Sequence, residues 1–257
     1  MIKAFVFDAY GTLYDVQSVA DILETSFPGC GDLATQMWRI KQLEYSWLRS
    51  MMRDYQDFWA VTRQSLTYTL DVLGLTPTEA LFETIAEAYN NLRLYPDAED
   101  ALGALKGYRL AILSNGSPDM LAMLGANSDL DRHVDAIISV DSKKVFEPDP
   151  RAYELIEERL GLSPAEVIFV SSNGFDISGA KHFGFRVARI ERVSQRSLLD
   201  EIIDPGALRP ATMFKALRTQ AEALGQQPDF VISSLLELAH LPSAIEALPA
   251  GPASERP

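Results

Sequence analysis

The segment FDAYGTL, residues 7–13, places a carboxylate where it could act as a nucleophile. Asp8 follows an apolar run and precedes a glycine turn, so we expect it to be held rigidly at the end of a strand. A carboxylate in that position can form a covalent intermediate with a substrate. An isolated D-x-x-G pattern is more typical of a turn or capping aspartate. The rest of the chain must therefore decide between these two interpretations.

Two further polar segments follow apolar runs in the same way. LSNG, residues 113–116, offers a hydroxyl, an amide and backbone N–H groups that could hold an anion. FVSSNGFD, residues 169–176, offers four polar side chains, those of Ser171, Ser172, Asn173 and Asp176. Three polar loops of this kind, one with a candidate nucleophile, indicate one catalytic site rather than three unrelated turns.

The elements between these segments predict a doubly wound α/β core. Apolar runs typical of strands buried on both faces of a parallel sheet lie at 2–7, 109–113, 135–140, 166–170 and 186–190. Helical patterns between them lie at 118–125, 149–160 and 175–183. Ligands of such sheets bind outside the carboxyl ends of the strands. Asp8, Ser114 and Ser171 are therefore expected to converge on one site.

Residues 15–93 interrupt the alternation and predict a helical cap. Helices are expected, with no convincing strand, at 16–27, 31–51, 55–74 and 77–92. We interpret 1–14 and 94–248 as a Rossmann-like core domain and 15–93 as an inserted cap subdomain that can exclude water from the site. The segment 249–257 is rich in Pro, Ala and Ser without periodicity, which predicts a disordered tail.

The composition restricts the partners of the protein. A formal net charge of -13 leaves no basic surplus to neutralise phosphates, which argues against a nucleic-acid partner. The only cysteine is Cys30, so neither an intramolecular disulfide nor a cysteine-based metal cluster is expected. No apolar run approaches the roughly 18 residues of a membrane helix, and no leader precedes the first apolar run. We therefore expect a cytoplasmic protein with no membrane partner.

The motifs together resemble the haloacid dehalogenase superfamily and, within it, the L-2-haloacid dehalogenases. The resemblance is carried by FDAYGTLYDV, MWRIKQLEYSWLR, ILSNGSPDM, VFEPDPRAYEL and FVSSNGFDISGAKHFGF, in this order over residues 2–240. It implies hydrolysis of a small L-2-haloalkanoate to a D-2-hydroxy acid and halide. Asp8 would attack C2, and water would then hydrolyse the aspartyl ester. It also implies a homodimer formed through the apolar cap helices and no cofactor.

Two positions separate dehalogenase from phosphatase chemistry. Phosphatases of the superfamily carry a second aspartate two residues after the nucleophile and an acidic residue ahead of the last motif's aspartate. Here these positions hold Tyr10 and Ser172. With Asp8 and Asp176 the only clear acids, a hard divalent cation lacks oxygen ligands, so no metal is predicted. A Mg²⁺-dependent small-molecule phosphatase is the alternative.

The resemblance also implies roles for individual residues. The halide cradle corresponds to Arg39, Asn115 and Phe175. The substrate carboxylate would be bound by Ser114 and the backbone amides of Ala9 and Tyr10. Residues that orient Asp8 or the hydrolytic water correspond to Thr12, Tyr153, Ser171, Asn173 and Asp176. An apolar wall that limits the site to small aliphatic acids would come from Tyr10, Leu43, Phe58 and, by our own interpretation, Trp59. Without the resemblance, Arg39 on a helix would be interpreted as a solvated charge.

Glu147 departs from the family pattern. The family has a lysine before this proline, which pairs with the nucleophilic carboxylate and keeps it ionised, whereas this chain has KKVFEPDP. Lys143 and Lys144 are not expected to replace it. A charge pair at about 4 Å contributes about 4 kcal/mol at an effective dielectric constant of about 20. Changing attraction to repulsion therefore predicts a loss of roughly 10³-fold or more in rate.

Three interpretations of Glu147 follow. The protein is a dehalogenase impaired at one position, by natural divergence or deliberate substitution; or it is active with another cation in place of the lysine; or it is a non-catalytic binder of small carboxylates. The carboxylates could relieve the repulsion by sharing a proton. A Glu147 side chain turned to solvent would also soften the penalty. We favour the first interpretation, with an intact fold and weak activity.

Overall fold

A six-stranded parallel sheet forms the centre of the computed structural model, in which residues 1–246 are described. Its strand order is β5-β4-β1-β6-β7-β8. The strands are β1 (Ala4–Phe7), β4 (Arg109–Ser114), β5 (Ala136–Ser139), β6 (Val167–Ser171), β7 (Arg186–Ile190) and β8 (Phe230–Ile232). Every residue of β1 and β6 is buried, as expected for central strands covered on both faces. The five predicted strands are therefore present, and the α/β fold class is confirmed.

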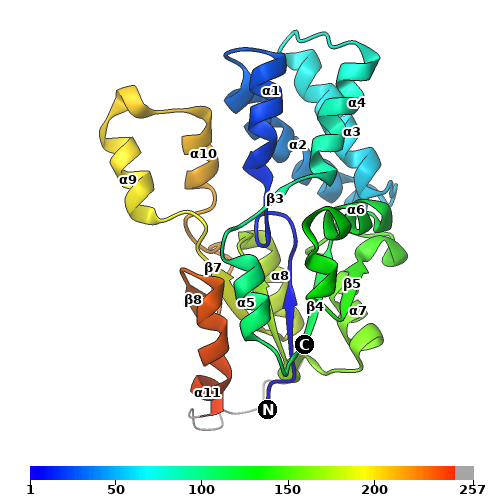
Figure 1. Ribbon diagram of the computed structural model, residues 1–257, viewed down its shortest axis with the longest axis vertical. Helices are drawn as coiled ribbons and strands as arrows, with labels where there is room; N and C mark the ends of the chain where they lie inside the picture. The colour runs from blue at the N-terminus through cyan, green and yellow to red at the C-terminus, as the bar shows by residue number, and fades with distance from the viewer. Residues whose placement is uncertain (247–257) are drawn as a thin grey trace.

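Helices cover both faces of this sheet. The core helices are α5 (Ala98–Ala104), α6 (Pro118–Ser128), α7 (Pro150–Leu160), α8 (Gly174–Phe183) and α11 (Leu241–Glu246). Because crossovers between parallel strands are right-handed, α5 and α6 lie on one face and α7 and α8 on the other. Figure 1 shows α5 in front of the sheet and α8 behind it. This arrangement brings the carboxyl ends of β1, β4 and β6 to one edge.

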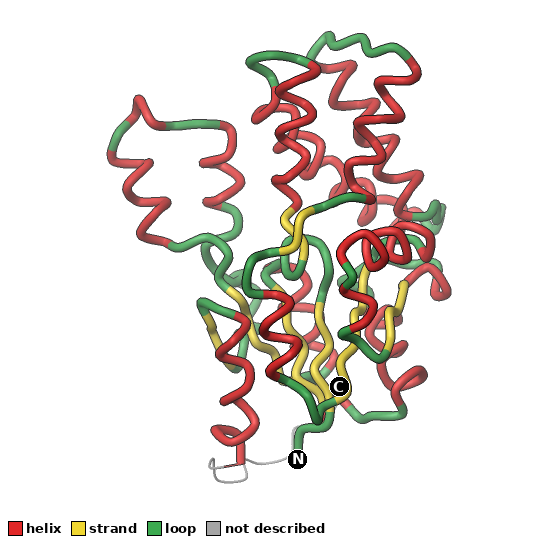
Figure 2. Tube along the Cα trace, in the orientation of Figure 1, coloured by secondary structure: helices red, strands yellow, loops and turns green. Residues whose placement is uncertain are grey.

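Four helices lie beyond that edge, at the top of Figures 1 and 2. These cap helices are α1 (Ala20–Ser26), α2 (Gly31–Met52), α3 (Phe58–Val72) and α4 (Glu79–Glu87). Asp57 caps α3 by accepting a hydrogen bond from the amide of Ala60 at 2.8 Å, and Thr78 caps α4 in the same way. The assignment of residues 15–93 to a separate subdomain stays an interpretation.

The prediction that residues 15–93 contain no strand is wrong at both ends. Asp15 and Arg93 pair in a small antiparallel sheet formed by β2 (Tyr14–Asp15) and β3 (Arg93–Leu94), where the chain leaves the core and returns to it. Each strand has two residues, which is too short to produce an alternating pattern in the sequence. The cap helices are therefore joined to the core through this two-stranded sheet.

Residues 191–229 form an excursion that the sequence did not predict. It contains α9 (Gln195–Ile203) and α10 (Pro210–Ala216), which stand beside the cap helices in Figure 1. Helix α10 packs against α2, so the excursion connects the core to the cap. The short 3₁₀ helices are Val16–Val19, Ala88–Asn90, Leu130–Arg132, Val140–Lys143, Pro164–Glu166, Pro205–Ala207 and Leu235–His240.

The segment 249–257, predicted to be a disordered tail, lies outside the described residues. Within residues 1–246, no helix combines the length and the apolar character that crossing a membrane requires.

Candidate active site

Asp8 lies directly after β1 and is 3% exposed. Its carboxylate oxygen Oδ2 accepts hydrogen bonds from Thr12 Oγ1 at 2.8 Å and from Asn173 Nδ2 at 2.6 Å. Gly11 has φ +87°, a conformation that glycine adopts without strain, and the turn it makes returns Thr12 to the carboxylate. Both hydrogen bonds fall on one oxygen, which fixes the carboxylate and leaves Oδ1 for other contacts.

The loop after β6 supports this nucleophile loop from the other side. The amide of Ser172 donates to Thr12 Oγ1 at 2.9 Å, and the Ser172 hydroxyl donates to the carbonyl of Gly11 at 2.6 Å. Arg218 in turn donates through Nη2 to Ser172 Oγ at 2.5 Å. A continuous series of hydrogen bonds therefore runs from Arg218 through Ser172 and Thr12 to Asp8.

Asp176 lies in the first turn of α8 and is completely buried. Its Oδ1 accepts a hydrogen bond from the Tyr153 hydroxyl at 2.8 Å. Burial and the nearby charge of Asp8 raise the pKa of Asp176 to about 8, although hydrogen bonds from the hydroxyls of Ser171 and Tyr153 act in the opposite direction. Asp176 is therefore a second titratable carboxyl group beside the nucleophile.

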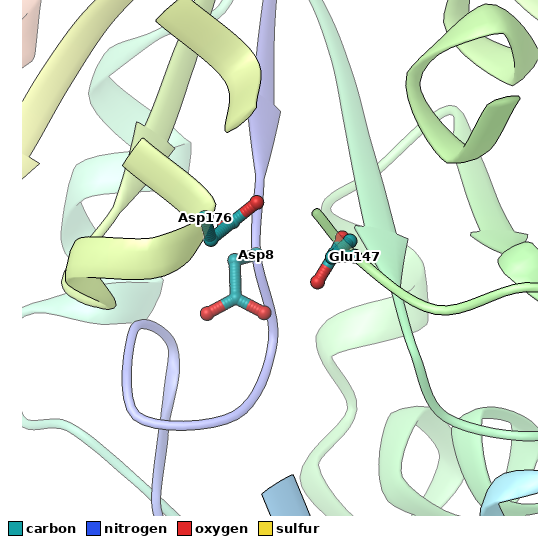
Figure 3. A group of neighbouring side chains, drawn as sticks. All are labelled: Asp8, Glu147 and Asp176. Atoms are coloured by element: carbon teal, nitrogen blue, oxygen red, sulfur yellow. The ribbon is translucent and has the colours of Figure 1, made fainter. Parts of the chain in front are cut away.

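Glu147 points into the site and is 1% exposed. Its backbone amide donates to Asn115 Oδ1 at 2.8 Å, which holds the segment against the loop after β4. Figure 3 shows its side chain gathered with those of Asp8 and Asp176, and one carboxylate oxygen from each of the three lies within 4.8 Å of the others. The suggestion that Glu147 could turn to solvent is therefore wrong, because its backbone is fixed and its side chain is enclosed.

The protonation of Glu147 follows from this enclosure. Burial raises its pKa well above the usual range, the charges of Asp176 and Asp8 raise it further, and Arg39 opposes them. Lys143 and Lys144 do not relieve this, because Lys143 pairs with acids of α7 and Lys144 pairs with Asp141 at 2.7 Å. The expectation that neither lysine replaces the missing one is confirmed.

Two arginines provide the positive potential at Asp8. Burial raises the pKa of Asp8 to about 6, and this rise is opposed by hydrogen bonds from Thr12 and Asn173 and by the charges of Arg39 and Arg218. Arg39 is 2% exposed, so its interpretation as a solvated charge is wrong. Its Nη1 donates to Gln42 Oε1 at 2.6 Å, whereas its Nε has no partner within residues 1–246. Arg39 therefore keeps one buried N–H for an anion.

Arg218 is the residue that the sequence did not indicate. It follows α10 in the excursion, and its side chain reaches Ser172 and stacks on Phe214 with 5.2 Å between the guanidinium carbon and the ring centroid. Burial lowers its pKa to about 10, as does the charge of Arg39. No motif marks this position, because the contact joins segments that are 46 residues apart.

Aromatic rings line the cap side of the site. Tyr10 packs on Phe58 with ring centroids 5.3 Å apart, and Phe58 packs on Phe146 at 5.9 Å. Phe175 meets Trp47 of α2 at 5.3 Å. These contacts close the cap helices over the loops that follow β1 and β6.

Four other residues that the sequence predicts to bind substrate have contacts that do not test this role. Leu43 is half-buried on α2, and the ring of Trp59 carries the guanidinium of Arg63 at 5.7 Å, a contact within the cap. Ser114 accepts a hydrogen bond from the Gly116 amide at 3.2 Å, and Ala9 is completely buried next to Asp8. The binding roles of these four residues stay predictions.

Asp8, Glu147 and Asp176 together could supply oxygen ligands to a metal ion. The sequence-based argument counted Asp8 and Asp176 as the only clear acids, but Glu147 adds a third carboxylate to the same space. Carboxylate oxygens are the ligands that hard divalent cations prefer. The argument that such a cation would lack oxygen ligands is therefore wrong.

The fold and the site together define a hydrolase class with an aspartate at the end of the first strand. The sequence model of the haloacid dehalogenase-like hydrolases matches residues 2–184. The chain is 57% identical to the (S)-2-haloacid dehalogenase of Xanthobacter autotrophicus, over 94% of this chain and 95% of that one. It is 40% identical to haloacetate dehalogenase H-2 of Moraxella sp. (strain B), over 93% and 97%.

Solved structures agree with these sequence comparisons. The structure of the L-2-haloacid dehalogenase from Xanthobacter autotrophicus with chloropropionic acid covalently bound matches with a TM-score of 0.91 and 55% identity, covering 95% of this chain and 100% of that chain. The protein belongs to the haloacid dehalogenase-like hydrolases and, within them, to the family of the (S)-2-haloacid dehalogenases.

Proposed function

We propose that this chain hydrolyses small L-2-haloalkanoic acids to D-2-hydroxy acids through an ester on Asp8. The observation that carries the proposal is the buried Asp8 carboxylate, whose Oδ2 holds two hydrogen bonds while Oδ1 is left to attack. The related enzyme of Xanthobacter autotrophicus with covalently bound chloropropionic acid supports a covalent route. Catalysis of this kind divides one difficult displacement into two easier steps.

In the first step, Oδ1 of Asp8 forms a bond to C2 of the substrate as the carbon–halogen bond breaks. The halide leaves with its electron pair, so no acid is needed to protonate it. The buried Nε of Arg39, which has no partner within residues 1–246, supports a halide cradle made by Arg39, Asn115 and Phe175. Because Arg39, Tyr10 and Phe58 are all buried, the arginine charge would act on the halide with little screening by water.

In the second step, water adds to the Asp8 carbonyl carbon and the hydroxy acid leaves with its oxygen. Asp8 recovers both carboxylate oxygens, one of them from water, and one proton is released. Asn173 donates to Asp8 Oδ2, so it can hold the negative charge that develops there. Asp176, with a pKa of about 8, and its partner Tyr153 support a role in orienting the water.

Glu147 weakens this chemistry by removing a positive charge rather than by adding a negative one. Burial and the charges of Asp176 and Asp8 raise its pKa well above the usual range, which favours its neutral form. The Asp8 pKa of about 6 leaves about nine-tenths of the nucleophile ionised at pH 7. The proposed impairment is therefore the loss of the attraction that a lysine would supply.

Halide release from L-2-chloropropionate tests the proposal directly. The proposal requires slow release by this chain, with the D-2-hydroxy acid as the product, and faster release by Glu147→Lys. Phosphate release from p-nitrophenyl phosphate with Mg²⁺, without halide release, would support the phosphatase alternative. Absence of halide release from both proteins would support a binder of small carboxylates.

The oligomeric state and the location remain proposals. A homodimer through the cap helices is supported by apolar side chains that are exposed on α2 and α3, namely Leu33, Leu48, Met51, Met52 and Val72. Light scattering with size-exclusion chromatography would give about twice the monomer mass for a dimer. We keep the cytoplasm as the expected location.

A further inference from the structure

Three carboxyl groups lie together in one buried space beside β1. Asp8, Glu147 and Asp176 each contribute one oxygen to a group in which all lie within 4.8 Å of one another (Figure 3). We propose that these three side chains bind a hard divalent cation, with Glu147 as the ligand that completes the site. The binding of the cation does not depend on whether the chain releases halide, so the two properties are measured separately.

The separations suit an oxygen-ligated cation. Three oxygens that lie within 4.8 Å of one another are each at most about 2.8 Å from a common centre. Because ligands of Ca²⁺ lie about 2.3–2.6 Å from the ion, all three carboxylates can reach one Ca²⁺ with shifts of at most a few tenths of an ångström. At this limiting separation Mg²⁺, whose ligands lie about 2.1 Å from the ion, requires larger shifts of the side chains than Ca²⁺ does. We therefore expect Ca²⁺ to bind more tightly than Mg²⁺.

The hydrogen bonding leaves oxygens available for such a cation. Glu147 Oε1 and Asp176 Oδ2 are buried and have no hydrogen-bond partner within residues 1–246. The other oxygen of Asp176 is used by Tyr153, and Oδ2 of Asp8 is used by Thr12 and Asn173. Buried polar atoms without partners are rare because each costs free energy. A cation in the common space would satisfy both unpartnered oxygens.

Within residues 1–246, neither Arg39 nor Arg218 forms an ion pair with any of the three carboxylates. Arg39 donates to Gln42 and Arg218 donates to Ser172, each through one terminal nitrogen. Binding of the cation requires all three carboxylates to be ionised, so it would release the protons that these buried groups hold. One divalent cation, three carboxylates and two arginines together carry one net positive charge, which suits the anionic substrate of the proposed function. The cation would thus restore the positive charge that the family obtains from a lysine.

Metal binding by the full-length chain tests this inference. After treatment with EDTA and desalting, the chain would be titrated with CaCl₂ and, separately, with MgCl₂ by calorimetry and by equilibrium dialysis. We expect one Ca²⁺ per chain, tighter binding of Ca²⁺ than of Mg²⁺, and an increase in Tm with CaCl₂ concentration. Absence of Ca²⁺ binding to the folded chain would overturn the proposal.

Variants at Glu147 show whether that residue is a ligand. Glu147→Gln should weaken Ca²⁺ binding by at least about tenfold, and Glu147→Lys should abolish it, because the ammonium group takes the place of the cation. Glu158→Gln serves as the matched control, since Glu158 is an acid of α7 that pairs with Lys143 outside the site. Equal Ca²⁺ binding by all four proteins would place the ion elsewhere and overturn the proposal. Circular dichroism would confirm that each variant is folded.

Discussion

Replacement of Glu147 by lysine should convert a neutral side chain into a cation beside Asp8. An ammonium group at the position of the Glu147 oxygen would lie within 4.8 Å of an Asp8 oxygen. At that distance and an effective dielectric constant of about 20, the attraction is about 3 kcal/mol. This corresponds to a decrease of about 2 units in the pKa of Asp8, from about 6 to about 4.

The pH dependence of halide release measures this change. For the chain itself, kcat/KM for L-2-chloropropionate should rise with pH to a plateau, with an inflection near pH 6 where Asp8 loses its proton. In Glu147→Lys the inflection should move to about pH 4, and the plateau should increase by up to roughly 10²-fold. EDTA in every assay removes divalent cations, which could otherwise bind beside Asp8 and mask the effect of the lysine.

Glu147→Gln separates the charge of residue 147 from its shape. Because we infer that Glu147 is protonated near neutral pH, a neutral amide of similar size should leave the plateau within a few-fold of the original. A large increase in Glu147→Gln would mean that Glu147 is ionised and repels Asp8. Identical pH profiles for the original chain and Glu147→Lys would refute the account of the missing lysine.

Three other perturbations follow from the same site. Asp8→Asn should abolish halide release, as the halide assay would show, while circular dichroism shows that the variant is folded. Equal rates of halide release from Asp8→Asn and from the unsubstituted chain would show that Asp8 is not the nucleophile. Arg218→Met should raise the inflection pH of kcat/KM above 6, because one of the two cations near Asp8 is lost, whereas Arg218→Lys should largely restore it. Asp8, Glu147 and Asp176 all bind protons more tightly in the folded than in the unfolded chain. Their contribution to stability is therefore complete below about pH 4 and is lost as the pH rises through the pKa of Asp8, about 6, and that of Asp176, about 8. The urea concentration at the midpoint of unfolding should consequently decrease between pH 5 and pH 8.5. The decrease should be smaller in Asp176→Asn.

The sheet and most of its helices could be predicted because parallel strands have a strong sequence signal. A strand such as β6 is buried on both faces, so it appears as a continuous apolar run, and its loop falls at the ligand-binding edge. Strand β8 has three residues, and the two helices of the excursion are short and separated by a proline and a glycine. Their structure depends on packing against α2 and β7, which no local pattern contains.

A site residue could be predicted from the sequence where its place after a strand determines the position of its side chain. Asp8 follows a central strand, so the fold determines where its carboxylate points. The direction of Glu147 is different, because it depends on the hydrogen bond between its own amide and Asn115, 32 residues away. The approach of Arg218 to Ser172 likewise requires the whole excursion to be folded. Contacts of that type become visible only in three dimensions.

The closure of the cap over Asp8 has a consequence for the rate of turnover. Asp8, Asn115 and Asp176 are each at most 5% exposed, so a haloacid in solution reaches them only when the groups that cover them move. The chain passes between core and cap at β2 and β3, so we expect the cap helices to move relative to the sheet there. The frequency with which the cap opens therefore sets an upper limit on kcat, however reactive the nucleophile becomes.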